Sequence, residues 1–229
     1  MKKIVIILNL IVVVMLAAAV PVFPQADIFR IAPGAEAHLS SLLNKPAMVS
    51  HATATPLGRN WFTLETDAHV FTDQVSLRQV VAVLLDIENQ PKYFDGRRSK
   101  LLTSVVSRTE NEALVDFVSI AMVPVVNIQL RTPYRARVRT ITSTDSIFSL
   151  DITQLPENSA TNGDIKNLVA PRYLEEVTIN GKKYTYIRVY SKMDINASIL
   201  PGARHTLERN SAPTNEEALE LIIAAARNK

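Results

Sequence analysis

The sequence predicts one α+β domain in which helices pack against a single antiparallel sheet. Three observations support this prediction. Apolar and polar residues alternate from Phe62, a series of strand-like runs with short connections follows, and an apolar helical stripe ends the chain. The connections between the strand-like runs are too short for helical crossovers, so we expect the strands to pair in antiparallel fashion.

The first 26 residues have the layout of a secretory signal peptide. Lys2 and Lys3 form a positive n-region, and an apolar run from Ile4 to Leu16 follows. Cleavage after Ala26 would leave roughly 200 residues, enough for one domain with a sizeable core. The alternative is an uncleaved anchor, because Ile4 to Phe23 has about the length that spans a bilayer. We therefore expect export to the periplasm or cell envelope, or secretion, with a possible membrane attachment.

Composition and charge exclude several kinds of site. The chain has no cysteine, which excludes disulfides, thiolate metal sites and cysteine nucleophiles. Its formal charge is only +3, and two positive residues lie in the leader, so nucleic acid is not an expected partner. We also expect no cofactor and no metal, because the sequence has no glycine-rich phosphate loop and no metal-ligand spacing. The histidines, which are all expected at the surface, are His38, His51, His69 and His205.

Residues 27–60 are expected to form an irregular arm, and residues 61–229 the domain proper. Prolines and glycines divide the arm, in which only Ala35 to Leu43 has the pattern of a short helix. The domain begins with a half-buried strand from Phe62 to Val70, which presents one face inward and places His69 on the other.

A helix is predicted directly after this strand. Ser76 and Gln79 form a capping box at its start, and the helix should end before Pro91 because proline disfavours the α conformation in the preceding residue. The strands expected next are Leu101 to Arg108, Ala113 to Ile120, Val125 to Leu130, Tyr134 to Thr142, and Ser146 to Thr153.

The last third of the chain contains a hairpin and a terminal helix. After a polar loop, strands from Tyr173 to Ile179 and from Lys182 to Met193 flank Asn180-Gly181, the residue pair that suits a type I′ turn. A second capping box, Thr214 to Glu217, predicts a helix that leaves Gly202 to Ser211 outside it or split from it. Its apolar stripe consists of Ala218, Leu219, Ile222, Ile223 and Ala226.

Two short motifs and the order of elements from Phe62 to Asn228 point to a known architecture. The motifs are the acidic-x-x-x-x-Pro-x-aromatic stretch from Asp86 to Phe94 and the Pro-x-Val-x-Asn stretch within Val123 to Asn127. Together they resemble the START-like superfamily, also called SRPBCC or Bet v 1-like. The resemblance implies the helix-grip fold, a curved antiparallel β-sheet wrapped around a C-terminal helix. It also implies an apolar cavity that holds a lipid, sterol, polyketide or other hydrophobic molecule.

Several apolar side chains are expected to face this cavity, although a packed core is the alternative for each. They are Phe117, Met122, Val126, Ile128, Leu130, Phe148, Leu150, Ile222 and Ile223. Tyr184, Tyr186 and Arg188 share one hairpin face and could orient a polar head group, with Glu175 opposite Tyr186. The alternative for this row is a cross-strand ladder on an exposed or half-exposed face.

Arg135, Arg137 and Arg139 alternate along one predicted strand, so their guanidinium groups project from one face. They are candidates for binding an anionic head group or phosphate. The alternative is a solvated outer face that discourages edge pairing.

The sequence favours an exported, noncatalytic binding protein for a lipid or other hydrophobic small molecule, with possible membrane contact. Two alternatives remain open. One is an envelope interaction module with a filled core, which the 27–60 arm could join to a partner. The other is a cyclase or hydrolase that uses Tyr184, Tyr186, Glu175 or Arg188 in a cavity. We rank the enzyme last because the sequence contains no recognisable catalytic constellation.

Overall fold

The computed structural model describes residues 28–58, 60–123, 128–156, 165–198 and 202–229. The predicted signal peptide and residues 124–127, which hold most of the second motif, lie outside these ranges. Within them, no helix is both long and apolar enough to span a membrane.

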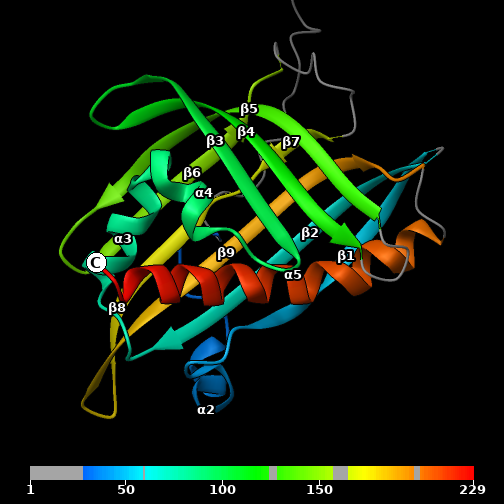
Figure 1. Ribbon diagram of the computed structural model, residues 1–229. Helices are drawn as coiled ribbons and strands as arrows, with labels where there is room; N and C mark the ends of the chain where they lie inside the picture. Colours follow the sequence, from blue (N-terminus) through cyan, green and yellow to red (C-terminus); the bar gives the residue numbers. More distant parts are fainter. Residues whose placement is uncertain (1–27, 59, 124–127, 157–164, 199–201) are drawn as a thin grey trace, which may run out of the picture.

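Nine antiparallel strands form one sheet in the order β1-β2-β9-β7-β6-β5-β4-β3, with β8 paired to β6 and β9. The strands are β1 (Ala47–Gly58), β2 (Trp61–Thr72), β3 (Ser99–Arg108), β4 (Glu112–Val123), β5 (Ile128–Ser143), β6 (Ile147–Gln154), β7 (Ile165–Val169), β8 (Arg172–Ile179) and β9 (Lys182–Asn196). The helices are η3 (Ala35–His38), α2 (Leu39–Leu42), α3 (Leu77–Leu85), η4 (Ile87–Asn89), α4 (Gln90–Tyr93) and α5 (Ala203–Ala226). The sheet curves around α5, whose C-terminal end lies beside α3 (Figure 1). This is the α+β helix-grip architecture that the sequence predicts.

The start of α3 follows from its capping box. The Ser76 hydroxyl accepts the backbone N–H of Gln79, and the Gln79 side chain accepts the N–H of Ser76. The helix ends at Leu85, before Pro91 as predicted, and Pro91 lies in the first turn of α4. A proline is tolerated there because the N–H that it lacks has no partner within the helix.

The terminal helix is longer than predicted, and the capping box predicted at Thr214 to Glu217 is wrong. Helix α5 begins at Ala203 and continues through Pro213. The Thr214 hydroxyl donates to the Asn210 carbonyl at 2.7 Å and does not cap a helix start. Glu217 accepts backbone N–H groups from residues 97–99 of another segment. In the folded chain, the Thr214 and Glu217 side chains therefore bind other groups and do not form the predicted capping box.

One long strand replaces two predicted ones. Residues 128–143 form β5 without interruption at Pro133, which is paired with Val118 of β4. Pairing between β5 and β6 begins only at Ala136, so the missing N–H of Pro133 interrupts no bond of that pairing.

The sequence predicted neither β1 nor β7. Strand β1 lies at the edge of the sheet, pairs with β2 through three register irregularities and contains Pro56, which an edge strand tolerates. Strand β7 has five residues and one register shift. Irregular pairing of this kind leaves no clean two-residue period in the sequence, so part of the predicted arm belongs to the sheet.

The two faces of the sheet are covered differently. The inner face, which faces α5, packs against α3 and the C-terminal half of α5, where the predicted stripe residues Leu219, Ile222, Ile223 and Ala226 are buried. The outer face of β2, β8 and β9 is covered by residues 28–43, which pack on Phe71, Tyr173 and Tyr186. This chain segment is called the outer strap below.

Candidate functional site

A cavity of about 290 Å³ lies between the inner face of the sheet and α5. Strands β2 to β9 contribute to its wall, and α4 and the middle of α5 contribute the other side. Most of its lining is apolar, including Phe94, Leu101, Phe117, Leu150, Met193 and Ile195. A concave, largely apolar space with a few polar groups is the usual form of a small-molecule site.

The side chains on the middle of α5 explain why this space is not filled. Four of them line the cavity, and each donates a hydrogen bond to the carbonyl four residues earlier in the helix, at 2.6–3.0 Å. These residues are Asn210, Ser211, Thr214 and Asn215. Their polar atoms are held against the helix backbone, and the side chains are short. The large apolar residues of the stripe begin only at Leu219, beyond the cavity.

Two charged side chains, Arg172 at the start of β8 and Lys100 on β3, line the cavity. The Lys100 ammonium is paired with Asp95 at 2.5 Å, whereas Arg172 binds backbone carbonyls. Arg172 Nη1 donates to the carbonyl oxygens of Ala170, Pro171 and Tyr190, each at 3.0 Å. Burial lowers the pKa of Arg172 to about 10, and burial raises the pKa of the neighbouring Tyr134 to about 12. At neutral pH the arginine is therefore charged and the tyrosine hydroxyl keeps its proton.

Uncharged polar groups also line the cavity. The hydroxyls of Thr66 on β2 and Ser191 on β9 lie 2.7 Å apart and share one hydrogen bond. Tyr134 stacks on Phe117 with ring centroids 5.2 Å apart, which fixes the position of its ring in the wall.

Three of the predicted cavity residues, Phe117, Met122 and Leu150, line the cavity. Phe148, Ile222 and Ile223 are buried in the packed core instead. Val126 lies outside the described residues. The backbones of Ile128 and Leu130 pair with β4, but their side chains are also outside the described part of the chain.

The hairpin residues Tyr184, Tyr186 and Arg188 do not line the cavity. Glu175 is paired with Tyr186 as predicted, but this row faces the outer side of the sheet, beneath the outer strap. Neighbouring β9 residues such as Ile187 point to the inner face, because side chains alternate along a strand. The two-residue period predicts the row correctly but cannot say which face meets the helix.

The structure corrects the prediction for His69, which is fully buried in a polar network beneath the outer strap. Its Nδ1 lies 2.5 Å from the Tyr186 hydroxyl, and its Nε2 lies 3.3 Å from Asp67 Oδ1. Asp67 accepts two hydrogen bonds from Arg188, at 3.0 and 2.7 Å. Burial lowers the pKa of His69 to about 4, against the opposing effect of Asp67. By contrast, His38 and His205 are exposed, as expected.

The same network holds the outer strap on the sheet. Arg188 Nη1 donates to the carbonyl oxygens of Ile28 and Arg30, and the Ala32 N–H donates to the Tyr186 hydroxyl at 3.0 Å. The polar side chains that look solvent-facing in the sequence are therefore buried by a segment remote in sequence. Asp67 and His69 share one face of β2, but no local feature of the sequence shows that the outer strap covers this face.

The alternating arginines lie on the outer face, away from the cavity. Arg135 binds Asp116 through Nε at 2.5 Å and Nη2 at 2.8 Å. Arg137 Nε lies 3.4 Å from a Glu112 carboxylate oxygen, and Arg139 is exposed. Two of the three guanidinium groups thus already face carboxylates on β4.

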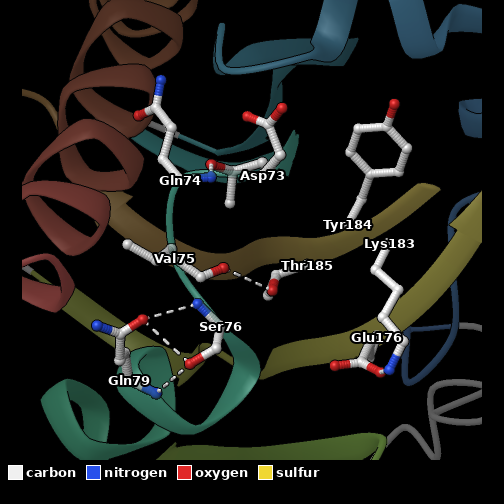
Figure 2. A pocket seen from close by; sticks show the side chains of 10 residues that line it. Asp73, Gln74, Val75, Ser76, Gln79, Glu176, Lys183, Tyr184 and Thr185 are labelled. Carbon is white, nitrogen blue, oxygen red and sulfur yellow. Dashed lines mark hydrogen bonds and ion pairs between the residues drawn. The ribbon is translucent and has the colours of Figure 1, made fainter.

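A second, more open depression of about 320 Å³ lies at the turn between β2 and α3, and Figure 2 shows the side chains that line it. Its polar groups are largely paired with each other. The Lys183 ammonium contacts Glu176 at 2.6 Å, and the Thr185 hydroxyl donates to the Val75 carbonyl at 2.8 Å. This depression is less enclosed and less apolar than the cavity under α5.

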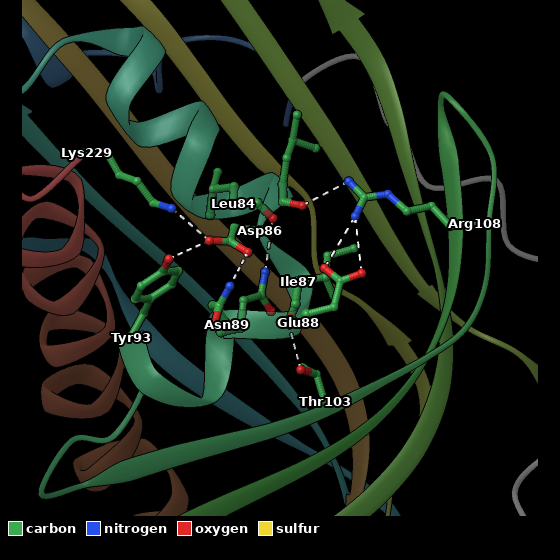
Figure 3. Close-up of polar contacts among 11 residues, drawn as sticks. Leu84, Asp86, Ile87, Glu88, Asn89, Tyr93, Thr103, Arg108 and Lys229 are labelled. Atoms are coloured by element: carbon green, nitrogen blue, oxygen red, sulfur yellow. Dashed lines mark hydrogen bonds and ion pairs between the residues drawn. The ribbon is translucent and has the colours of Figure 1, made fainter.

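The motif at Asp86 to Phe94 serves a structural purpose at the end of α3 (Figure 3). Asp86 accepts hydrogen bonds from Asn89, from the Tyr93 hydroxyl at 2.5 Å and from the Lys229 ammonium at 2.8 Å. Lys229 is the largest cause that holds the pKa of Asp86 well below its usual range. The motif therefore joins the turn after α3 to the C-terminal end of the chain. Among the described residues, no group of three histidine or acidic side chains could hold a metal ion.

No protein-family model matches the chain, and no curated protein matches it significantly. Among solved structures, a protein from Thermus thermophilus shares 13% identity over 72% of this chain and 94% of its own, with a TM-score of 0.48. A hypothetical protein from Helicobacter pylori has 12% identity over 69% of this chain and 84% of its own, with a TM-score of 0.42. The di-domain ARO/CYC StfQ from the steffimycin biosynthetic pathway has 14% identity over 72% of this chain and 51% of its own, with a TM-score of 0.43.

Proposed function

We propose that this protein binds a hydrophobic small molecule, such as a lipid, in the cavity between the sheet and α5. The observation that carries the proposal is the partly enclosed, mainly apolar space beneath the middle of α5. Its volume of about 290 Å³ is close to the lower end of the usual range for ligand pockets, about 300–1,000 Å³. The ligand would be a small molecule or a single acyl chain.

The proposal includes export and membership of the START-like superfamily. Export is supported by the leader-like first 26 residues, and a protein that carries an apolar molecule outside the cytoplasm would meet its ligand at the envelope membrane. Superfamily membership is supported by the helix-grip architecture and by the motif from Asp86 to Phe94.

A carrier suits the cavity better than an enzyme does. The residues considered for catalysis, Tyr184, Tyr186 and Arg188, lie under the outer strap on the other face. The polar groups that line the cavity include no histidine and no carboxylate among the described residues. General acid–base chemistry normally needs such a group within reach of the substrate.

A cavity-filling variant tests the proposal. Ala218 on α5 lines the cavity, whereas Ala224 is exposed on the same helix. We expect Ala218→Phe to reduce uptake of the neutral fluorescent probe N-phenyl-1-naphthylamine, and Ala224→Phe to leave uptake unchanged. Native mass spectrometry of each protein purified from its own envelope, followed by extraction of bound molecules, provides a second comparison. We expect Ala218→Phe to carry less bound apolar molecule than the unaltered protein and Ala224→Phe to carry the same amount. The proposal fails if the unaltered protein carries no apolar molecule and takes up no probe.

A further inference from the structure

Arg188 is buried and Arg172 is half-buried in the cavity wall, and the partners of these two arginines differ. Arg188 on the outer face forms a two-pronged ion pair with Asp67. Arg172 on the inner face contacts only neutral carbonyl oxygens, and all three of those bonds come from Nη1. Within the described ranges no carboxylate lies within ion-pair distance of Arg172, and its Nε and Nη2 have no hydrogen-bond partner.

An unpaired guanidinium is costly in an apolar wall. A buried charge is normally paired, because desolvation disfavours the charged form. The two sites reflect this difference, since the pKa of Arg172 is lowered by burial while the pKa of Arg188 is raised with the help of Asp67. An anion placed beside Arg172 would supply the missing partner.

The groups around Arg172 suit the head of an amphiphile. Tyr134 lies close enough for its charge state to interact with Arg172, and its hydroxyl has no hydrogen-bond partner among the described residues. A protonated phenol can donate to an anionic oxygen, and a guanidinium can bind two such oxygens through Nε and Nη2. Most of the exposed surface inside the cavity is apolar and comes from side chains such as Leu168 and Met193. The other charged side chain in the wall, Lys100, is already paired with Asp95.

From this arrangement we infer that the ligand is an anionic amphiphile, whose carboxylate or phosphate group binds Arg172 while its apolar part fills the cavity. This inference rests on the proposed function and adds the chemical class of the ligand. Tyr134 is the second donor to the same anionic group.

Matched single-chain ligands test the inference by titration calorimetry. Octanoate and octyl phosphate carry the anion, octanol is the neutral counterpart, and acetate and inorganic phosphate are the anions without a chain. A hydrogen-bonded charge contributes about 1.5–3 kcal/mol, so we expect octanoate or octyl phosphate to bind about 10- to 100-fold more tightly than octanol. The tighter of the two identifies the head group.

Variants assign this preference to named side chains. We expect Arg172→Met to lower the affinity for the anionic ligand to that for octanol, without changing the affinity for octanol itself. Arg172→Lys should keep part of the preference, and Tyr134→Phe should reduce it while the arginine remains. Tyr134→Phe also preserves the test if Arg172→Met fails to fold, as measured by circular dichroism and thermal melting.

Three outcomes overturn the inference. Equal binding of octanol and octanoate, unchanged in Arg172→Met, would leave the proposed function intact but assign Arg172 a purely structural role. Tight binding of inorganic phosphate or acetate, with no gain from the chain, would indicate a free-anion site. Failure to bind any of these ligands or N-phenyl-1-naphthylamine would remove the proposed function as well.

Discussion

Acidification should destabilise this protein through His69. Its imidazole is fully buried between Tyr186 and Asp67, and the Tyr186 hydroxyl also accepts the N–H of Ala32. That hydroxyl can therefore donate its own proton to Nδ1, which leaves the ring proton on Nε2, facing Asp67. A second proton on the ring would remove the acceptor at Nδ1 and place a positive charge near Arg188.

The magnitude follows from the pKa of His69, which burial lowers from 6.5 to about 4. The unfolded chain binds a proton below about pH 6.5, whereas the folded chain does so only below about pH 4. The free energy of unfolding therefore falls as the pH decreases through this window and is unaffected by His69 above it. At about 1.4 kcal/mol per pH unit, the loss is roughly 3 kcal/mol by about pH 4.

Urea unfolding of the protein and of His69→Gln, from about pH 7 to about pH 4, measures this effect. Carboxylates that titrate in the same range are present in both proteins, so their contribution cancels in the difference. We expect the difference in stability between the two proteins to shift by roughly 3 kcal/mol in favour of the variant at low pH. His38→Gln, at an exposed site in the outer strap, should follow the unaltered protein. Parallel curves for the protein and His69→Gln would refute the reasoning.

Two further predictions concern the contacts that hold the C-terminal helix. A Cβ at Gly96 would lie 2.5 Å from Glu217, so Gly96→Ala should displace the carboxylate that accepts three backbone N–H groups and lower stability by about 1–3 kcal/mol in urea unfolding. An unchanged urea midpoint for Gly96→Ala would contradict this prediction. Lys229→Ala should raise the pKa of Asp86 toward its usual range, because Lys229 is the largest cause of its depression. Carboxyl NMR titration measures this change, and an unaltered titration would show that Tyr93 and Asn89 suffice.

Much of the fold could be predicted because its strongest signals are local. The capping box at Ser76 and Gln79 requires only residues three apart, and Asn180-Gly181 requires only the geometry of one turn. The apolar stripe from Leu219 likewise follows from helical spacing. The same local logic failed at Thr214, because tertiary contacts compete for the side chains that a helix start would use.

The site was harder to predict because it depends on which face of the sheet each element covers. Alternation along β9 identifies two rows of side chains, but only the folded chain shows that α5 lies over the row with Ile187 and the outer strap over the row with Tyr186. Arg172 gave no signal in the sequence, since its importance comes from the absence of a carboxylate near it.

The sequence by itself determined the fold class, the antiparallel pairing, the start of α3 and the hairpin at Asn180-Gly181. Each depends on the spacing of neighbouring residues, which the chain carries wherever it packs. Only the tertiary structure decided that His69 is buried, that the middle of α5 leaves a cavity and that Arg172 lies in its wall. These features depend on long-range contacts, which determine the solvation and pairing of a side chain and which no short stretch of sequence contains.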